Sequence, residues 1–504
     1  MRVGVLDILA LPSQSPADAV YHALITKQFA SITPQAISVW CRRLGHDTFY
    51  AVYYGAGDAR RLLPPDLDLV FIACYTQVSP IAYAVALLYR KAGTRTVVGG
   101  PHAKAFPVDC LRFFDLVVKD CDQALIADIL AGQFDPGSVV SSARPFDDVP
   151  TVEERMPEIR ASAFYWGRKR LRLSTIPMLA STGCPYRCDF CIDWDNAYRQ
   201  LPTARLAADV RYLAGRLPGT LIVFHDPNFA VRFDQVFEVL ESVPPPVRPP
   251  YMMESTLTVL RDEARLARLK KTNCALVAPG VESWSDYSNK AGLGHTAGLQ
   301  KVDRVAEHFH RLHQNVPYLQ ANFMFGLATD SGTEPAELTR LFMDRTPFVW
   351  PVINIPMPFG GTPVHHDLVR QNRILRAMPF GFYYAPYLVT TLKHYDPVSY
   401  YAQLVDLLEH ASTPAMLRRR LASTGNRTIR LVHRIRTAGV RANLRNYRRI
   451  LGMLRDDARF RAFHEGRSTA LPEFYRHRYE RMLGQYSAVL SPADRVPNLD
   501  PGPV

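Results

Sequence analysis

Three cysteines stand close together in the second third of the chain and could share one metal group. The run from Ser181 to Cys191 reads S-T-G-C-P-Y-R-C-D-F-C, with thiols at Cys184, Cys188 and Cys191. A loop this short can direct three thiolates at three corners of one cubane cluster, and soft sulfur ligands select zinc or iron–sulfur. Structural zinc takes a fourth ligand, usually from a second paired spacing, and the sequence holds no second pair. The spacing therefore indicates a 4Fe–4S cluster with one iron left open.

The composition limits where this metal site can be. Eight cysteines in 504 residues are too few for a disulfide framework, so clustered thiols indicate a reducing cytoplasm. The chain is 47% hydrophobic and 21% charged, which is typical of a globular protein with a sizeable core and more than one domain. It contains no run of about 20 apolar residues and no signal-peptide pattern at its start. We therefore expect a cytoplasmic protein without a membrane span. The other cysteines are expected to be small buried apolar residues: Cys41, Cys74, Cys110, Cys121 and Cys274.

Strand and helix signals alternate over residues 1–145, which predicts a parallel, doubly wound, Rossmann-like sheet. Ligands of such sheets lie at the carboxyl ends of the strands, and this places Tyr75–Ser79 and Gly99–His102 on the binding edge. The expected strands are Val3–Leu9, Thr48–Tyr53, Asp68–Cys74, Thr94–Val98 and Leu116–Val118, and the expected helices are Gln35–Leu44, Ile81–Lys91 and Ala124–Leu130.

A second alternating series follows a Pro-rich, charged segment at 146–170 that reads as a linker. Six strand–helix repeats over residues 171–382 favour a parallel barrel, partial or full, with chemistry at the carboxyl ends of its strands. The cysteine loop directly follows the first of these strands. The expected strands are Ile176–Ser181, Thr220–Phe224, Tyr251–Glu254, Ala275–Pro279, Leu319–Phe325 and Val352–Ile355, with helices at Ala204–Leu217, Asp262–Lys271, Val302–Leu312 and Glu334–Met343.

Residues 383–504 read as a helical C-terminal domain that becomes strongly basic. The formal net charge is +13, and a large share of the arginines follows Leu417. A basic face can bind nucleic acid, anionic lipid or an acidic substrate. The plainer interpretation is a solvated helical surface.

The cysteine run resembles the signature of the radical S-adenosylmethionine (SAM) superfamily, C-x₃-C-x-aromatic-C, with Phe190 at the aromatic place. The resemblance implies that Cys184, Cys188 and Cys191 bind the cluster and that SAM chelates the fourth iron. Reduction by an external flavodoxin or ferredoxin would then cleave SAM to a 5′-deoxyadenosyl radical, which abstracts hydrogen from the substrate. Phe190 would pack near the adenine.

Further matches to this family stand at the ends of the later strands. The resemblance implies that these residues face SAM, and Gly326 is expected to allow a close approach of backbone to the adenine. The segment PFGGTP from Pro358 to Pro363 also matches. The residues concerned are Asp226, Asn228, Glu254, Ser255, Glu282, Ser283, Asn322 and Gly326.

The N-terminal region resembles the cobalamin-binding domain that precedes the barrel in one large subgroup of this family. The pieces that match lie at Pro34–Ala36, Gly45–His46, Tyr75–Ser79 and Val98–His102, and glycines at a strand end let backbone approach a bulky ligand. The chain has no Asp-x-His-x-x-Gly motif, which is usual in this subgroup, but Lys119–Asp122 replaces a common G-E-G-E segment. The alternative is a degenerate domain kept for architecture. The residues implied for cobalamin are Thr76, Gln77, Ser79, Gly99, Gly100 and His102.

The resemblance implies a cobalamin-dependent radical SAM enzyme that methylates an unactivated carbon or phosphorus centre of a small molecule. A radical cyclase or rearrangement enzyme is the alternative within the same subgroup. A nucleic-acid-binding iron–sulfur protein is the alternative from another class, and it depends on the arginine-rich C-terminal segment alone.

Overall fold

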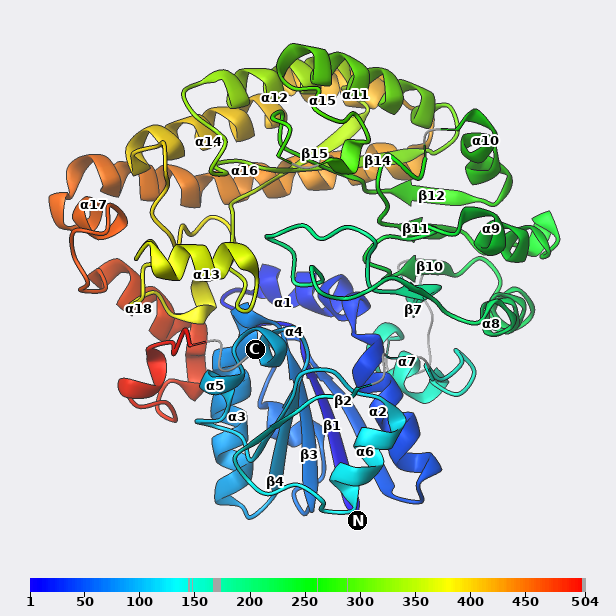
Figure 1. The fold of residues 1–504 in the computed structure, drawn as a ribbon, viewed down its shortest axis with the longest axis vertical. Helices are drawn as coiled ribbons and strands as arrows, with labels where there is room; N and C mark the ends of the chain where they lie inside the picture. Colours follow the sequence, from blue (N-terminus) through cyan, green and yellow to red (C-terminus); the bar gives the residue numbers. More distant parts are fainter. Residues whose placement is uncertain (144–145, 147, 166–173, 261, 288, 501–504) are drawn as a thin grey trace.

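The computed structural model describes residues 1–143, 146, 148–165, 174–260, 262–287 and 289–500. It has an α/β fold with two separate parallel sheets and a helical C-terminal region, as the sequence predicts. Figure 1 shows the N-terminal sheet below, the second sheet at the upper right, and the C-terminal helices running over the top and down the opposite side. No described helix is both long and apolar enough to cross a membrane.

The N-terminal sheet is parallel throughout, with the strand order β2-β1-β3-β4-β5-β6. Helices α2 (Ile32–Arg43) and α6 (Gln123–Leu130) cover one face, and α3 (Ser79–Lys91) covers the other. The five expected strands are present, and β6 is an additional edge strand, too short and too exposed to leave a periodic signal. The strands are β1 Arg2–Ile8, β2 Asp47–Tyr53, β3 Leu69–Cys74, β4 Arg95–Gly99, β5 Leu116–Val118 and β6 Ser138–Val140; further helices are α1 Pro16–Leu24, α4 Pro101–Ala105 and α5 Pro107–Cys110.

The expected linker contains a helix, α7 (Met156–Ala163), that is packed between the two sheets. Arg155 is fully buried and donates hydrogen bonds to Gln35 Oε1 (2.8 Å) in the N-terminal domain and to the Pro177 carbonyl (3.1 Å) in the second sheet. The guanidinium of Arg155 is therefore hydrogen-bonded inside the protein, where an unsatisfied charged group would be costly, whereas Glu153 and Arg160 of the same segment are exposed. Residue 147 and residues 166–170 of the predicted linker lie outside the described residues.

The second sheet is an open, partial barrel of parallel strands in the order β7-β10-β11-β12-β14-β15. β13 follows β12 in the chain, also pairs with β14, and has a bulge between Gly280 and Glu282. Its helices lie on the outer side of the sheet (Figure 1). All six predicted strands and all four predicted helices are present, within a few residues at each end. The strands are β7 Thr175–Met178, β10 Leu221–Phe224, β11 Tyr251–Met253, β12 Cys274–Val277, β13 Gly280–Glu282, β14 Tyr318–Met324 and β15 Val349–Asn354; the helices are α8 Thr203–Arg216, α9 Phe233–Glu241, α10 Glu263–Lys271, α11 Gly298–His313 and α12 Glu334–Arg345.

The C-terminal helices connect the barrel back to the N-terminal domain. Tyr486 Oη accepts a hydrogen bond from the Ala59 amide (2.8 Å), and the Asn498 amide donates to Asp109 Oδ1 (2.7 Å). The last described residues accordingly lie beside the N-terminal domain. The helices are α13 Pro363–Arg370, α14 Pro397–Ser412, α15 Pro414–Ala422, α16 Arg427–Asp456, α17 Ala458–His464 and α18 Glu473–Leu483.

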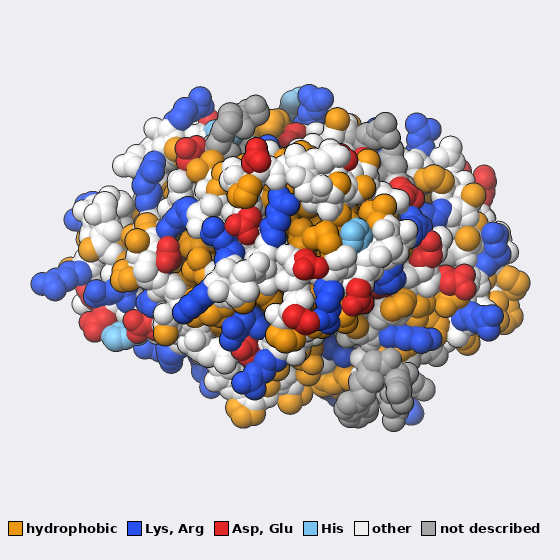
Figure 2. Space-filling model, turned by 90° about the horizontal axis from the view of Figure 1, so that it is seen from below, with side chains coloured by type: hydrophobic (Ala, Val, Ile, Leu, Met, Phe, Trp, Pro, Cys, Tyr) orange, Lys and Arg blue, Asp and Glu red, His pale blue; other side chains and the backbone are white. Residues whose placement is uncertain are grey.

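Basic and acidic side chains are mixed on the face of the molecule that Figure 2 shows, which is the side of the N-terminal domain. The positive net charge is therefore not gathered into one patch on this face. The arginine-rich part of the C-terminal region lies in the long helix α16, on the barrel side of the molecule.

Candidate active site

The cysteine loop is closed at its base by a two-residue hairpin pairing. β8 (Ser181–Thr182) pairs in antiparallel fashion with β9 (Arg199–Gln200), and the Cys184 amide donates to the Asn196 carbonyl at 3.0 Å. Gly183 has φ +65°, and a Cβ there would overlap the Ala197 carbonyl oxygen. Only glycine fits this position, and it holds the cysteine loop in its turn.

The three thiols of the loop are partly buried and form no disulfide. Within the described residues, no three His, Cys, Asp or Glu side chains converge on one metal ion. A cubane cluster places each thiolate on a different iron, so its ligands need not converge in this way. Burial raises the pKa of all three thiols, that of Cys188 to about 11, and the nearby Lys290 ammonium partly offsets the effect. The donor set thus fits a cubane cluster.

Asp226 fastens the start of this loop to the second strand of the barrel. Its carboxylate accepts hydrogen bonds from the amides of Ala180 (3.1 Å) and Ser181 (2.5 Å) and from the Ser181 hydroxyl (2.5 Å). Burial raises the pKa of this carboxyl to about 6, against the lowering effect of these donors. The residue expected to face SAM therefore orients the cysteine loop.

Asn228 and Ser255 join the ends of β10 and β11 behind Cys184. Asn228 Oδ1 accepts from the Thr256 amide (3.0 Å), and Ser255 Oγ donates to the Phe229 carbonyl (3.0 Å). Asn228 Nδ2 has no acceptor in standard geometry and approaches Cys184, where it opposes the burial that raises the pKa of that thiol. This amide is a polar group available to a cluster sulfur.

Lys290 lies beside the cysteines, although no motif of the sequence points to it. Its ammonium lies 2.9 Å from Glu282 Oε1 and 5.3 Å from the centre of the Phe190 ring. Burial raises the pKa of Glu254, and Lys290 opposes that rise. Two acidic residues predicted to face SAM thus share one cation beside the cysteines. A single lysine eight residues after Glu282 leaves no sequence signal until the fold is known.

Aromatic residues of the cysteine loop contact later segments of the barrel. The rings of Phe190 and Tyr287 stack with centroids 5.9 Å apart, and Tyr287 Oη donates to Asp189 Oδ1 (2.7 Å). Trp194 Nε1 donates to the Gly361 carbonyl (3.1 Å), which lies in the expected Pro358–Pro363 segment. These contacts fix the loop against the rest of the barrel.

The remaining predicted SAM residues lie on the last strands of the barrel. Ser283 Oγ is 2.9 Å from Ser285 Oγ, and Asn322 Nδ2 donates to the Ala278 carbonyl (3.4 Å). Gly326 has φ +97°, and a Cβ there would lie 2.6 Å from the ring of Tyr400. The close approach that requires glycine at this position is thus to a tyrosine of α14.

A cavity of about 610 Å³ lies between the carboxyl edge of the N-terminal sheet and the cysteine loop. Three neighbouring strands contribute Asp7, Ala73 and Gly99 to its wall, and these residues are paired in register. A Cβ at Gly99 would meet only the Val118 carbonyl oxygen, at 3.9 Å. The loop side is lined by Thr182, Gly183, Ile192, Asp193, Asp195, Asn196, Ala197 and Arg199.

Asp7 is a buried carboxyl at this wall, and its two oxygens differ in their contacts. Oδ2 accepts from the Ser31 amide (2.8 Å), whereas no described residue donates a hydrogen bond to Oδ1. Burial raises the pKa of Asp7 to about 7. An unpaired buried carboxyl oxygen is costly and marks this edge as a place for a ligand with a donor group.

The residues implied for cobalamin separate into two groups. Gly99 and Gly100 line the cavity, as do Lys119 and Asp120 of the segment that replaces G-E-G-E. Thr76, Gln77, Ser79 and His102 do not. Ser79 Oγ donates to the Thr76 carbonyl (2.9 Å); His102 Nε2 lies 2.5 Å from Tyr83 Oη, and burial lowers the pKa of its imidazole to about 3. Ser79 thus closes the turn between β3 and α3, and His102 of α4 packs against that turn and against α3.

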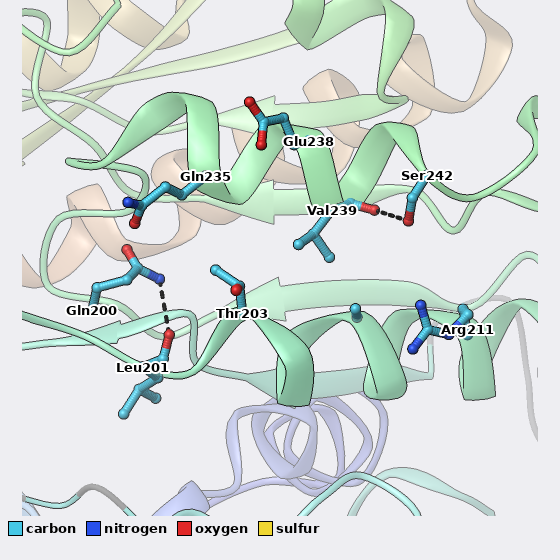
Figure 3. A pocket seen from close by; sticks show the side chains of 9 residues that line it. Gln200, Leu201, Thr203, Arg211, Gln235, Glu238, Val239 and Ser242 are labelled. Carbon is cyan, nitrogen blue, oxygen red and sulfur yellow. Dashed lines mark hydrogen bonds between the residues drawn. The ribbon is translucent and has the colours of Figure 1, made fainter.

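A second, more open groove of about 570 Å³ lies on the outer side of the barrel between α8 and α9. Figure 3 shows Gln200, Thr203 and Arg211 on one side and Gln235 and Glu238 on the other. It is lined by outward helices and contains none of the residues predicted to bind a cofactor.

Comparisons with known proteins agree with this arrangement. Residues 178–342 match the model of the radical SAM superfamily. The chain is 23% identical to the bacteriochlorophyllide d C-8(2)-methyltransferase of Chlorobaculum tepidum, over 66% of this chain and 75% of that protein. It is also 23% identical to the C-12(1)-methyltransferase of the same organism, over 60% of this chain and 66% of that protein.

Two solved structures share the fold over most of their length. The cobalamin-dependent SAM radical enzyme OxsB, with aqua-cobalamin bound, has a TM-score of 0.59 at 13% identity and covers 98% of this chain and 82% of its own. The radical SAM methyltransferase TsrM of Kitasatospora setae has a TM-score of 0.50 at 15% identity and covers 75% of this chain and 77% of its own. The cysteine loop follows the first strand of the partial barrel inside the matched region, so residues 178–342 form a domain that matches the radical SAM superfamily.

Proposed function

We propose that this protein is a cobalamin-dependent radical SAM methyltransferase that acts on a carbon centre of a small molecule. The observation that carries the proposal is the cavity shared by Gly99 at the N-terminal sheet edge and Gly183 in the cysteine loop. A cofactor seated at that sheet edge would lie directly against the cluster loop. The N-terminal domain then serves as a binding domain and is more than an architectural remnant.

The relatives support methyl transfer over rearrangement. Both curated relatives are named as methyltransferases acting at numbered carbon positions of bacteriochlorophyllide d. The phosphorus centre and the radical cyclase find no counterpart among them. We therefore propose carbon as the acceptor of the methyl group.

The residues of the chain fit the cofactors that this reaction needs. Cys184, Cys188 and Cys191 would hold a 4Fe–4S cluster, and Lys290 with Glu282 lies where the charged groups of SAM would meet the protein. The open surface at Gly99 and the free oxygen of Asp7 would receive cobalamin, without a histidine from this chain on cobalt. When bound, these groups supply a 5′-deoxyadenosyl radical and a transferable methyl group.

The chain's own part in the reaction is orientation and shielding. Asp226 fixes the base of the cysteine loop, and Trp194 ties the loop to Gly361. The stacked rings of Phe190 and Tyr287 restrict water beside the thiols. We place the protein in the cytoplasm with a flavodoxin or ferredoxin as electron donor, because such a cluster needs reducing surroundings.

Cofactor retention tests the proposal. Anaerobically reconstituted protein should hold about four irons per chain and should keep hydroxocobalamin through gel filtration. Replacing the three loop cysteines with Ala should abolish the iron–sulfur absorbance and leave cobalamin bound, because the N-terminal sheet is untouched. Iron retained by the triple variant, or cobalamin lost from the wild type, would contradict the proposal.

A further inference from the structure

The arginine-rich helix α16 sends one of its arginines into the barrel. The helix has nine arginines and no acidic residue before Asp456. The guanidinium of Arg436 lies 4.7 Å from the centre of the Trp350 ring and donates to Tyr318 Oη at 3.0 Å. No acidic side chain within the described residues forms an ion pair with it. The other hydrogen bond of Arg436 therefore indicates which part of the barrel this arginine holds.

That contact is a hydrogen bond from Arg436 to Gln320 Oε1 at 2.8 Å. Gln320 in turn donates through Nε2 to Asn322 Oδ1 at 2.9 Å. Side chains alternate along a strand, and Leu319, Ala321 and Phe323 of β14 pack into the core beneath the outer helices. Gln320 and Asn322 therefore share the opposite face, toward the inside of the barrel.

Asn322 is hydrogen-bonded to the two residues that connect β12 to β13, directly before the bulge between Gly280 and Glu282. Its Nδ2 donates to the Ala278 carbonyl (3.4 Å), and its amide donates to the Pro279 carbonyl (3.1 Å). The register shifts at this bulge, and the chain leaves it at Glu282 with φ +65°. Bulges re-aim side chains near active sites, and this one directs Glu282 toward Lys290.

We propose that Arg436 is a positioning residue for the SAM-binding wall of the barrel. It fixes the amide orientation of Gln320, which fixes Asn322 and thereby the bulge that presents Glu282. This inference rests on the proposed function, because SAM is the ligand of that wall. It gives the basic C-terminal helix a role in the active site that does not depend on nucleic acid or lipid.

Two substitutions, two positions apart in β14, distinguish the hydrogen-bond relay from Arg436 through Gln320 to Asn322 from an effect of packing alone. Gln320→Glu keeps an acceptor for Arg436, now as an ion pair, but removes the amide donor to Asn322. Tyr318→Phe removes the other acceptor of Arg436 and leaves the relay intact. We expect Gln320→Glu to unfold at the wild-type temperature and to bind SAM about tenfold more weakly, the effect of one lost buried hydrogen bond. Tyr318→Phe should bind SAM as the wild type does.

SAM binding is measured as the SAM concentration needed to change the electron paramagnetic resonance spectrum of the reduced cluster. This measurement needs no turnover and no substrate. Arg436→Gln should raise that concentration as Gln320→Glu does, whereas Arg434→Gln, an exposed arginine of the same helix, should not. Should Gln320→Glu fail to fold, the two arginine variants decide.

The possible results are distinguishable. Equal SAM concentrations for wild type, Gln320→Glu and Arg436→Gln would overturn the relay. An equal rise for Arg434→Gln and Arg436→Gln would also overturn it, since helix charge alone would then suffice. A wild-type cluster with four irons whose spectrum never responds to SAM would instead contradict the proposed function.

Discussion

The carboxylate of Asp226 accepts hydrogen bonds from both the amide and the hydroxyl of Ser181, each at 2.5 Å. These bonds connect the end of the second barrel strand to the residue three positions before the first cysteine. The geometry of the cluster loop thus depends on a residue that touches no cysteine. A buried carboxylate with several donors is hard to replace, because its removal leaves those donors unsatisfied.

Replacing Asp226 should therefore lower cluster occupancy without touching a ligand. We expect Asp226→Ala to be reconstituted with well under half the iron of the wild type, and Asp226→Asn to be intermediate, since the amide keeps one acceptor oxygen. Iron analysis after anaerobic gel filtration measures this. Asp234→Ala, an exposed carboxylate on the same side of the barrel, is the control, and full iron content in Asp226→Ala would refute the anchoring role.

Asp7 makes the stability of the cofactor-free protein depend on pH. Burial raises its pKa from 3.8 to about 7, so the folded state binds the proton more tightly than the unfolded state does. Stability from this group is greatest below about pH 4, falls as the pH rises toward 7, and then stays level. The loss at pH 8 is on the order of 4 kcal/mol, at 1.36 kcal/mol per pKa unit.

Asp7→Asn should remove that loss. The variant should unfold at a higher urea concentration than the wild type at pH 8, and the difference should shrink steadily between pH 7 and pH 4. Asp135→Asn, an exposed carboxyl of the same domain, should show no such trend. A constant difference across this range would mean that Asp7 does not titrate there.

The wall of the cavity can be filled at Gly99. A Cβ at this position has open space before it, whereas one at Gly100 would lie 3.2 Å from the Cys74 carbonyl and would suffer from φ +94°. Gly99→Leu should therefore abolish cobalamin retention with little change in thermal stability. Gly215→Leu, on the exposed side of α8 with nothing within 4 Å, serves as the control. Undiminished cobalamin binding by Gly99→Leu would place the cofactor elsewhere.

Lys290 should matter for SAM and much less for the cluster. It is the cation nearest the acidic residues Glu254 and Glu282, and Lys290→Met would leave both carboxylates facing the carboxylate of SAM. We expect at least tenfold weaker SAM binding in equilibrium dialysis and near-normal iron content. Lys271→Met, exposed at the end of α10, should bind normally. The reverse pattern, with iron lost and SAM affinity kept, would mean that Lys290 supports the cysteine loop and does not contribute to SAM binding.

The sequence predicts the architecture well because each strand and helix carries its own periodic pattern. The six barrel strands, from Thr175–Met178 to Val349–Asn354, all stand where apolar runs alternate with helices. The cysteine spacing likewise identifies its chemistry without a structure. Site residues are harder to predict. Asp226 and His102 have the expected types at the expected places, yet their side chains contact protein groups that only the folded chain brings near. The glycine at Gly326 likewise makes room for the ring of Tyr400.

Long-range pairs explain what the sequence does not reveal. Arg155 links two sheets from an apparent linker, and Arg436 reaches Gln320 from 116 positions away. No local pattern encodes such contacts. A charged segment reads as solvated surface until the partner that buries it is known.

Product analysis tests the central claim most directly, because a methyltransferase of this kind uses SAM in two ways. Reconstituted protein is incubated with SAM, cobalamin and a strong reductant, and both SAM products are quantified by mass spectrometry. We predict 5′-deoxyadenosine together with S-adenosylhomocysteine. In the triple-cysteine variant only the radical product, 5′-deoxyadenosine, should be lost. 5′-Deoxyadenosine alone, with cobalamin demonstrably bound, would contradict methyl transfer and favour a rearrangement.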